Sequence, residues 1–300
     1  MKKISATTNL ISTILICISL FGISVLGIFT VAHIFIVPFA FAGIYFVSYL
    51  FWKTHNANFP YYFHIALLFL MMNNGLAAKL NYRSLTILFT FITFLFSCIS
   101  LNNSRKKGLE FRSISVSVSE IYNRWKNMFQ ENTGIVFHAG IHACILLILG
   151  YIATLIYKYR GYWLMVSGLA VLIGDEYGKI ITRGLKRILG AFVGFFIGIL
   201  LVSLNAKGPI LIVILLLTYV GAFALMPFKY ILGSACIGLQ AVLGNAMMQN
   251  CFSYEIFMQR MFWTIAGTIL TFALCFLMDK SFPNLYTNYE KEPLIYQKEV

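Results

Sequence analysis

Long stretches without charge are the feature that most constrains this chain. Residues 9–52 contain no Asp, Glu, Lys or Arg. A bilayer core about 30 Å thick is crossed by a helix of roughly 20 apolar residues, so this stretch is long enough for two spans. We expect the turn near Gly27 and His33, with Pro38 early in the second span. Helices are expected because lipid leaves backbone groups no partners outside the chain.

The same pattern recurs along the chain. The apolar segments that follow are residues 61–80, 84–101, 134–157, 161–173, 184–205, 209–228, 230–250 and 257–278. They predict an all-α, polytopic membrane helix bundle of about ten transmembrane helices, four before a polar stretch and six after it. The composition agrees, since 60% of the residues are hydrophobic and 11% are charged. A soluble domain would be nearer about a quarter charged.

The basic residues predict the orientation. The chain has 23 Lys and Arg against 10 Asp and Glu, a formal net charge of +13, which in a soluble domain would suggest nucleic-acid binding. With an even number of spans both termini lie on one side, and 17 of the 23 basic residues fall on that side. Because cytoplasmic loops are enriched in Lys and Arg, we expect both termini in the cytoplasm and no nucleic-acid partner.

Four regions follow from these spans. We expect a four-span membrane region in residues 1–101, a cytoplasmic loop in 102–133, a six-span membrane domain in 134–279 and a cytoplasmic tail in 280–300. In the loop, hydrophobic residues from Ile114 to Val118 alternate with serines and predict a short extended piece. Ser119 is then expected to cap an amphipathic helix. That helix would pack on the ends of the spans, lie in the headgroup layer or bind a partner.

The most informative segment is residues 161–201. Tyr162 and Trp163 open a span, and such aromatic residues are common at membrane interfaces. Asp175 and Glu176 close it. Basic residues at intervals of four then share one helix face; these are Lys179, Arg183 and Arg187. Glycines continue that face as a ridge suited to close helix packing; these are Gly190, Gly194 and Gly198.

A helix face of this kind favours anion handling. The planar guanidinium group suits carboxylates, so the arginines are placed to receive an anion at the mouth of a pathway. We expect the anion to meet Lys179, Arg183 and Arg187 and to stack near Tyr162 or Trp163. Asp175 and Lys179 also have the spacing of a simple helical ion pair.

The segment resembles the fusaric acid resistance and aromatic acid exporter family of membrane proteins. Its residues 187–194 are similar to the family pattern Arg-x-x-Gly-Thr-x-x-Gly, with Ala191 in place of the Thr. A second element, Arg-x-x-x-Thr-x-x-Gly, is matched by Arg260, Thr264 and Gly267, which we expect to act in helix packing. Ser167 stands near the position of a Ser or Thr that follows the Tyr-Trp pair. The resemblance covers about residues 134–279, and residues 9–101 resemble weakly the last four spans of another such repeat.

The resemblance implies a function. Its members export organic anions, typically aromatic carboxylic acids, across the inner membrane, sometimes with a periplasmic adaptor protein. We therefore expect an inner-membrane transporter for aromatic carboxylic acids or related toxic weak acids, and not an enzyme. A homodimer is expected from the resemblance alone, and the lipid bilayer is the surrounding partner. A passive anion channel and a scaffold or assembly protein remain alternatives.

The histidines are candidates for proton coupling. No carboxylate lies in the middle of a predicted span, and a proton-coupled transporter usually keeps an ionisable group inside the membrane. His138 and His142 share a helix face, where the family tends to have arginines, and Asp175 and Glu176 lie at a span end. The histidines are equally consistent with polar residues that face other helices. We expect no metal site, since a third ligand is lacking, and no cofactor.

Overall fold

The computed structural model describes residues 6–30, 33, 35–55, 113–131, 133–156, 162–173, 177–203, 208–225, 229–249 and 254–282. In these ranges the chain is helical and has no strand, which confirms the predicted all-α class for this part of the chain. Two compact units are present, one formed by Met1–Tyr162 with Met278–Val300 and the other by Trp163–Leu277. The predicted spans at 61–80 and 84–101 lie outside the described residues.

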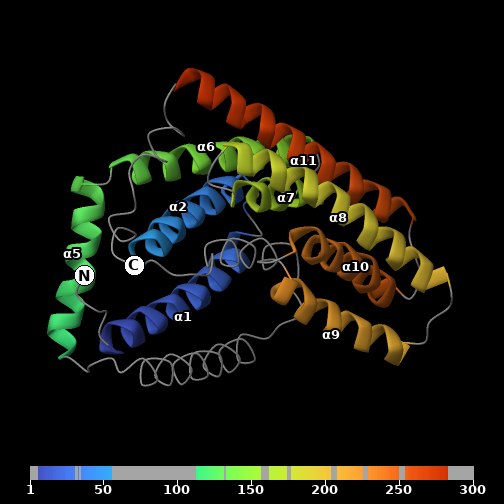
Figure 1. Ribbon diagram of the computed structural model, residues 1–300, viewed down its shortest axis with the longest axis horizontal. Coiled ribbons are helices and arrows are strands. Elements are labelled where there is room, and N and C mark those ends of the chain that lie inside the picture. Colours follow the sequence, from blue (N-terminus) through green and yellow to red (C-terminus); the bar gives the residue numbers. More distant parts are fainter. Residues whose placement is uncertain are drawn as a thin grey trace. The chain divides into compact units, whose positions relative to one another are not determined.

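The first unit contains α1 (Ala6–Phe29), α2 (Val37–His55), α5 (Ile114–Glu131) and α6 (Thr133–Ile156) (Figure 1). The break between α1 and α2 confirms the turn predicted near His33. There the His33 amide donates to Thr30 O at 3.0 Å and the Ile36 amide donates to His33 O at 2.9 Å. The antiparallel helices α2 and α6 form the main packing contact of this unit.

The start of α5 corrects a prediction. The helix begins at Ile114, so the prediction of an extended piece before Ser119 is wrong. A lone extended piece has no neighbouring strand to satisfy its backbone, whereas a helix satisfies its own. Here the Ser117 hydroxyl and amide both donate to Ser113 O at 3.1 Å, and the Ser117 side chain is buried. Packing therefore outweighs the strand preference of the valines.

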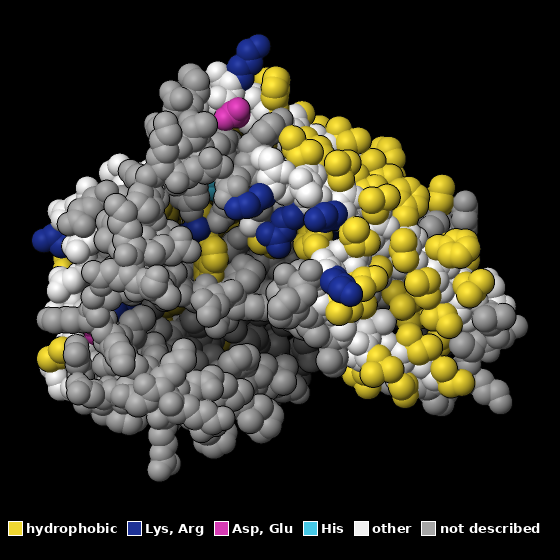
Figure 2. All heavy atoms as spheres, in the orientation of Figure 1, with side chains coloured by type: hydrophobic (Ala, Val, Ile, Leu, Met, Phe, Trp, Pro, Cys, Tyr) yellow, Lys and Arg dark blue, Asp and Glu magenta, His cyan; other side chains and the backbone are white. Residues whose placement is uncertain are grey.

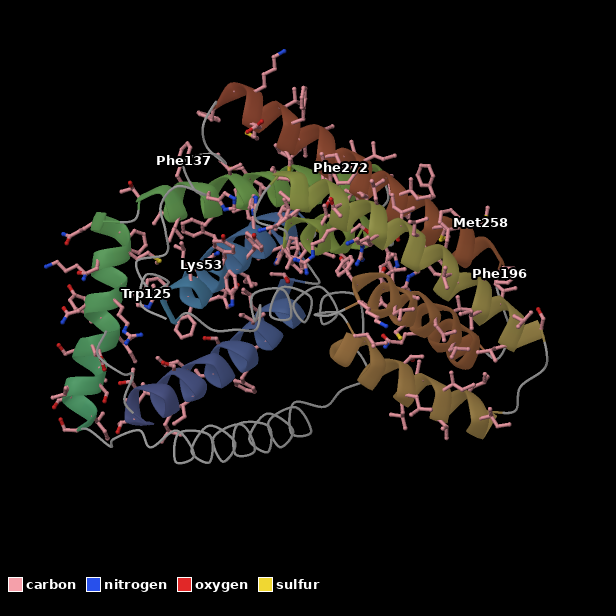
Figure 3. The ribbon with its side chains drawn as sticks, viewed as in Figure 1. Lys53, Trp125, Phe137, Phe196, Met258 and Phe272 are labelled. Atoms are coloured by element: carbon pink, nitrogen blue, oxygen red, sulfur yellow. The ribbon has the colours of Figure 1, made fainter. Side chains whose placement is uncertain are left out.

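Helix α5 lies across the ends of its neighbours. The Thr8 hydroxyl, in the first turns of α1, donates to Glu120 Oε2 at 3.0 Å. Near the C-terminal end of α2, the ring centroids of Phe51 of α2 and Trp125 of α5 are 6.1 Å apart. Figure 1 shows α5 running across the direction of α1 and α6, and Figure 3 labels Trp125 on it. The amphipathic helix thus packs on the helix ends.

The second unit consists of α7 (Tyr162–Leu172), α8 (Tyr177–Ser203), α9 (Gly208–Leu225), α10 (Tyr230–Gln249) and most of α11 (Tyr254–Ser281). Helix α10 packs on both α8 and α9. Helix α7 has only 11 residues, and at about 1.5 Å per residue it is too short to cross a bilayer alone.

Three described segments are long and apolar enough to cross a membrane, namely Thr133–Leu155, Gly178–Leu201 and Met258–Ser281. The outward face of α8 is apolar from Leu189 onward, and Phe196 there is 71% exposed. Figure 2 shows a broad hydrophobic surface, and Figure 3 shows Phe196 and Met258 pointing outward from α8 and α11. Such surfaces suit lipid contact. The count of about ten spans and the orientation of the termini remain predictions.

Candidate functional site

The glycine ridge holds α8 close against α10. A Cβ added at Gly190 would lie 2.5 Å from Ile231 O, and one added at Gly198 would lie 2.7 Å from Val242 Cβ. A Cβ at Gly194 would collide with the carbonyl oxygen of Ala235. Small residues let two backbones approach in this way. The second unit therefore depends on the absence of side chains along this face.

Two further glycines hold α11 in place. A Cβ added at Gly184 of α8 would lie 2.8 Å from Thr268 Cγ2 and would collide with the ring of Phe272. On α11 itself, a Cβ at Gly267 would lie 2.8 Å from Leu164 O and 2.9 Å from Ser167 Cβ of α7. Helix α11 thus contacts both α8 and α7 at positions where no side chain intervenes.

Arg187 lies between these two packing faces of α8. Successive residues of a helix are rotated by about 100°, which places Arg187 between Gly184, on the α11 side, and Gly190, on the α10 side. Its backbone oxygen accepts a hydrogen bond from Ser234 Oγ of α10 at 3.0 Å. The side chain points into the interior of the second unit, and only 5% of it is exposed.

Three buried side-chain atoms in the second unit have no hydrogen-bond partner among the described residues. They are Nε of Arg187, Oγ of Ser167 and Nε2 of Gln240, and Ser167 is completely buried. A buried polar group without a partner costs about 1–3 kcal/mol, and more if it is charged. A ligand that offered acceptor oxygens to these donors would remove that cost.

Arg183 and Arg260 rest on aromatic rings. The guanidinium carbon of Arg183 lies 5.0 Å from the ring centroid of Tyr230, and its Nη1 donates to Ile173 O at 3.1 Å, just beyond the end of α7. The guanidinium carbon of Arg260 lies 3.5 Å from the Trp163 centroid. Such contacts are favourable cation–π interactions. One face of the Trp163 ring, where a substrate was expected to stack, is thus occupied by Arg260.

The other predicted site residues are placed as follows. Lys179 is exposed on α8. Thr264 of α11 is buried, and its hydroxyl donates to Arg260 O at 2.9 Å. Asp175, Glu176 and the side chain of Tyr162 lie outside the described residues. Among the side chains that the structure describes in the second unit, none is a carboxylate. Aromatic rings lie against Arg183 and Arg260, and Arg183 also donates to a backbone oxygen.

The histidine pair lies in the first unit and faces two tyrosines. His142 Nδ1 is hydrogen-bonded to the Tyr45 hydroxyl at 3.0 Å, and His138 Nδ1 to the Tyr49 hydroxyl at 3.4 Å. The two imidazole centroids are 4.1 Å apart. All four side chains are at most 1% exposed. We call Tyr45, Tyr49, His138 and His142 the histidine–tyrosine ladder.

Sequence reasoning missed the tyrosines, although a signal was present. Tyr45 and Tyr49 have the same spacing of four residues as His138 and His142, so two antiparallel helices can match them in register. In the part of the chain that the structure describes, no group of three or more His, Cys, Asp or Glu could hold a metal ion.

Long apolar helices that bury arginine and histidine side chains define a multi-pass helical membrane protein. Comparison with known families adds a more specific result. Residues 143–274 match the family model described as fusaric acid resistance protein-like, which confirms the predicted resemblance over that segment. The match includes Arg187, the glycine ridge and Arg260, and it suggests a role in membrane transport or efflux. No curated protein and no solved structure gives a match.

Proposed function

We propose that this protein transports organic anions through the second unit. The observation that carries the proposal is the buried Arg187 guanidinium, whose Nε has no hydrogen-bond partner among the described residues. A charge buried in this way is costly unless it is paired. A transported carboxylate supplies both the opposite charge and the acceptor oxygens for a fork-shaped pair.

The basic face of α8 supplies an entry route. Lys179 is exposed, Arg183 is half-buried and Arg187 is buried. An anion that approaches from the start of α8 meets progressively less hydrated positive charge, and electrostatic attraction strengthens as water is removed. The aromatic rings of Tyr230 and Trp163 beside the arginines favour carboxylates that carry an aromatic ring. Tyr162 and Ser167 complete the proposed substrate contacts.

The direction and setting belong to the same proposal. The family match supports efflux of aromatic carboxylic acids or related toxic weak acids, and the distribution of basic residues supports an inner-membrane orientation with cytoplasmic termini. Asp175 and Glu176, which follow α7 in the sequence, are proposed coupling residues. A homodimer and a periplasmic adaptor are proposed partners.

A binding and flux experiment tests the proposal. The full chain is reconstituted in liposomes, and the probe is phthalate, an aromatic dicarboxylate that crosses bare bilayers slowly. Arg187→Gln should weaken phthalate binding by about tenfold or more, since loss of a charge-assisted pair costs about 1.5–3 kcal/mol. Lys186→Gln removes the same charge from the exposed neighbouring position and should change binding by less than about twofold. Equal effects of the two substitutions would reject Arg187 as the site.

The same liposomes separate the alternatives. A transporter moves phthalate in a saturable way, and any current that it carries depends on the coupling gradient. A steady, uncoupled anion current would instead favour a passive channel. No phthalate flux under any gradient, together with normal folding, would favour a scaffold or assembly protein.

A further inference from the structure

The histidine–tyrosine ladder continues to the end of α2. Lys53 lies one helical turn beyond Tyr49, and its Nζ is 5.5 Å from the Tyr49 ring centroid and 4.4 Å from the Trp52 ring centroid. Figure 3 labels Lys53 on α2 and Trp125 on α5. Because Phe51 of α2 contacts Trp125 of α5, this end of the ladder is the end of the unit across which α5 lies.

The ladder reaches about half-way across a bilayer. The candidate span of α6 begins at Thr133, and a helix rises about 1.5 Å per residue. His138 therefore lies about 8 Å and His142 about 14 Å along the span. Half of the hydrocarbon core is about 15 Å thick. From the α5 end, the order is Lys53, then Tyr49 with His138, then Tyr45 with His142.

The polar ladder stops at the middle of the span. The next positions on the same helix faces are Phe41 on α2 and Leu146 and Leu149 on α6, and all three are completely buried. These side chains have no group that can accept or donate a proton. Among the residues that the structure describes, the titratable groups of the ladder therefore continue toward the α5 end, and apolar side chains pack at its inner end.

We propose that the histidine–tyrosine ladder is a proton-binding site, reached from the α5 end of the first unit, that couples anion transport to a proton gradient. The coupling rests on the function proposed above, whereas the proton-binding site can be tested without it. A path that ended on both sides in water would leak protons. A site entered from one side and closed by Phe41, Leu146 and Leu149 instead holds its proton until the helices rearrange.

The chemistry of the site balances with a single proton. A proton from water binds an imidazole nitrogen, the site carries one positive charge, and the same proton returns to water on release. Two charged imidazoles with centroids 4.1 Å apart would repel strongly, so the pair takes up one proton between its members. When His142 Nδ1 carries a proton, it donates to the Tyr45 oxygen; when it does not, the Tyr45 hydroxyl donates to it.

The neighbouring charges fit a site for one proton. Tyr45, Tyr49 and Lys53 face the histidines from α2. On α5, Arg124 Nη2 and Glu120 Oε1 are 3.7 Å apart and form an ion pair, so their charges largely compensate each other. The positive charge of Lys53 at the mouth disfavours a second positive charge on the ladder.

Gradient-driven transport provides the first test. In liposomes with a clamped membrane potential, a gradient of about one pH unit can drive about tenfold accumulation of phthalate if one proton is exchanged for each anion. His142→Gln should abolish this accumulation while phthalate exchange at equal concentrations continues. Tyr151→Phe is the matched control, because it removes a hydroxyl on α6 that donates to Phe35 O, outside the ladder. Full accumulation by His142→Gln would overturn the coupling.

A spectroscopic test does not depend on transport. The full chain, with ¹⁵N-labelled histidine, is placed in lipid nanodiscs, and its five histidines are followed by NMR as the pH is lowered. We expect His138 and His142 to gain one proton between them, and Tyr45→Phe and Tyr49→Phe to shift these two titrations alone. If both histidines stay neutral over the whole range in which the protein remains folded, or if they titrate independently, the proton site is rejected. If phthalate flux is absent but the shared titration is present, only the proposed function fails.

Discussion

The two units bury polar side chains in opposite ways. In the first unit the buried histidines of α6 are hydrogen-bonded to the buried tyrosines of α2. In the second unit the buried Arg187 Nε and Ser167 Oγ have no such partner among the described residues. Both arrangements lie between apolar helices, where water gives little help. The Nδ1 atoms of the two histidines have partners within the chain, whereas Arg187 Nε and Ser167 Oγ can receive an added partner.

This contrast separates two kinds of function. A hydrogen-bonded cluster keeps its geometry and can exchange a proton with little movement, because each bonded hydroxyl and ring nitrogen can reverse its donor and acceptor roles. A buried guanidinium whose Nε has no partner among the described residues carries a free-energy cost that a ligand can remove, and that cost becomes binding free energy. The ladder thus suits a proton and the arginine suits an anion.

The largest expected effect concerns the packing that frames the arginine. Gly194→Ala places a methyl group against the Ala235 carbonyl, so α8 and α10 must separate. We expect the free energy of unfolding to fall by about 3 kcal/mol. Gly140→Ala on α6 is the matched control, since nothing lies within 4 Å of its added Cβ. It should leave stability unchanged or raise it by up to about 1 kcal/mol. Reversible unfolding in mixed detergent micelles measures both, and similar losses would contradict the packing assigned to the ridge.

Removal of one member of the ladder should destabilise the first unit. His142→Leu replaces the imidazole with an apolar side chain of similar size, and it leaves the Tyr45 hydroxyl buried without that hydrogen-bond partner. We expect a loss of about 2 kcal/mol. The double variant Tyr45→Phe with His142→Leu should recover part of this loss, because no polar group is then left behind. The same unfolding measurement decides, and simple additivity would show that the hydrogen bond is absent.

Arg187→Met should change the free energy of unfolding in the opposite direction to these destabilising substitutions. The substitution removes a buried charge that has no partner on Nε and keeps an apolar chain of comparable length. We expect stability in the absence of ligand to be unchanged or to rise by about 1 kcal/mol, while phthalate binding is lost. Thermal unfolding with and without phthalate checks both parts. A marked loss of stability without ligand would mean that Arg187 is paired inside the protein.

Much of the fold followed from apolar runs. The break between α1 and α2 near His33 and the long helices of residues 134–278 could be predicted from the length of a bilayer span. The short helix α7 could be predicted only from its apolar run, which ends before Asp175. The start of α5 could not, because the burial of Ser117 and the contact of Thr8 with Glu120 decide it. Local alternation of valines and serines favours a strand only when a neighbouring strand exists.

The candidate site could be predicted only in part. Helical spacing put Arg183 and Arg187 on one face, but it could not show that Arg183 is held by Tyr230 while Arg187 is left without a partner on Nε. Arg260 was expected to act in helix packing, and only the tertiary structure shows its guanidinium on the Trp163 ring. Which aromatic ring each arginine meets depends on contacts between residues far apart in the chain, and one sequence does not contain that information.

The smallest expected effect compares two buried serines of the second unit. Ser234 Oγ donates to Arg187 O, whereas Ser167 Oγ has no partner among the described residues. Ser234→Ala should therefore lower the free energy of unfolding by about 1 kcal/mol, and Ser167→Ala should leave it unchanged or raise it by a few tenths of a kcal/mol. Because the two substitutions remove the same atom from buried helices, their difference isolates hydrogen bonding from packing. If Ser167→Ala costs as much as Ser234→Ala, its hydroxyl is already satisfied and cannot be waiting for a ligand. If Ser167→Ala leaves stability intact but weakens phthalate binding by several-fold, the hydroxyl and Arg187 serve the same anion.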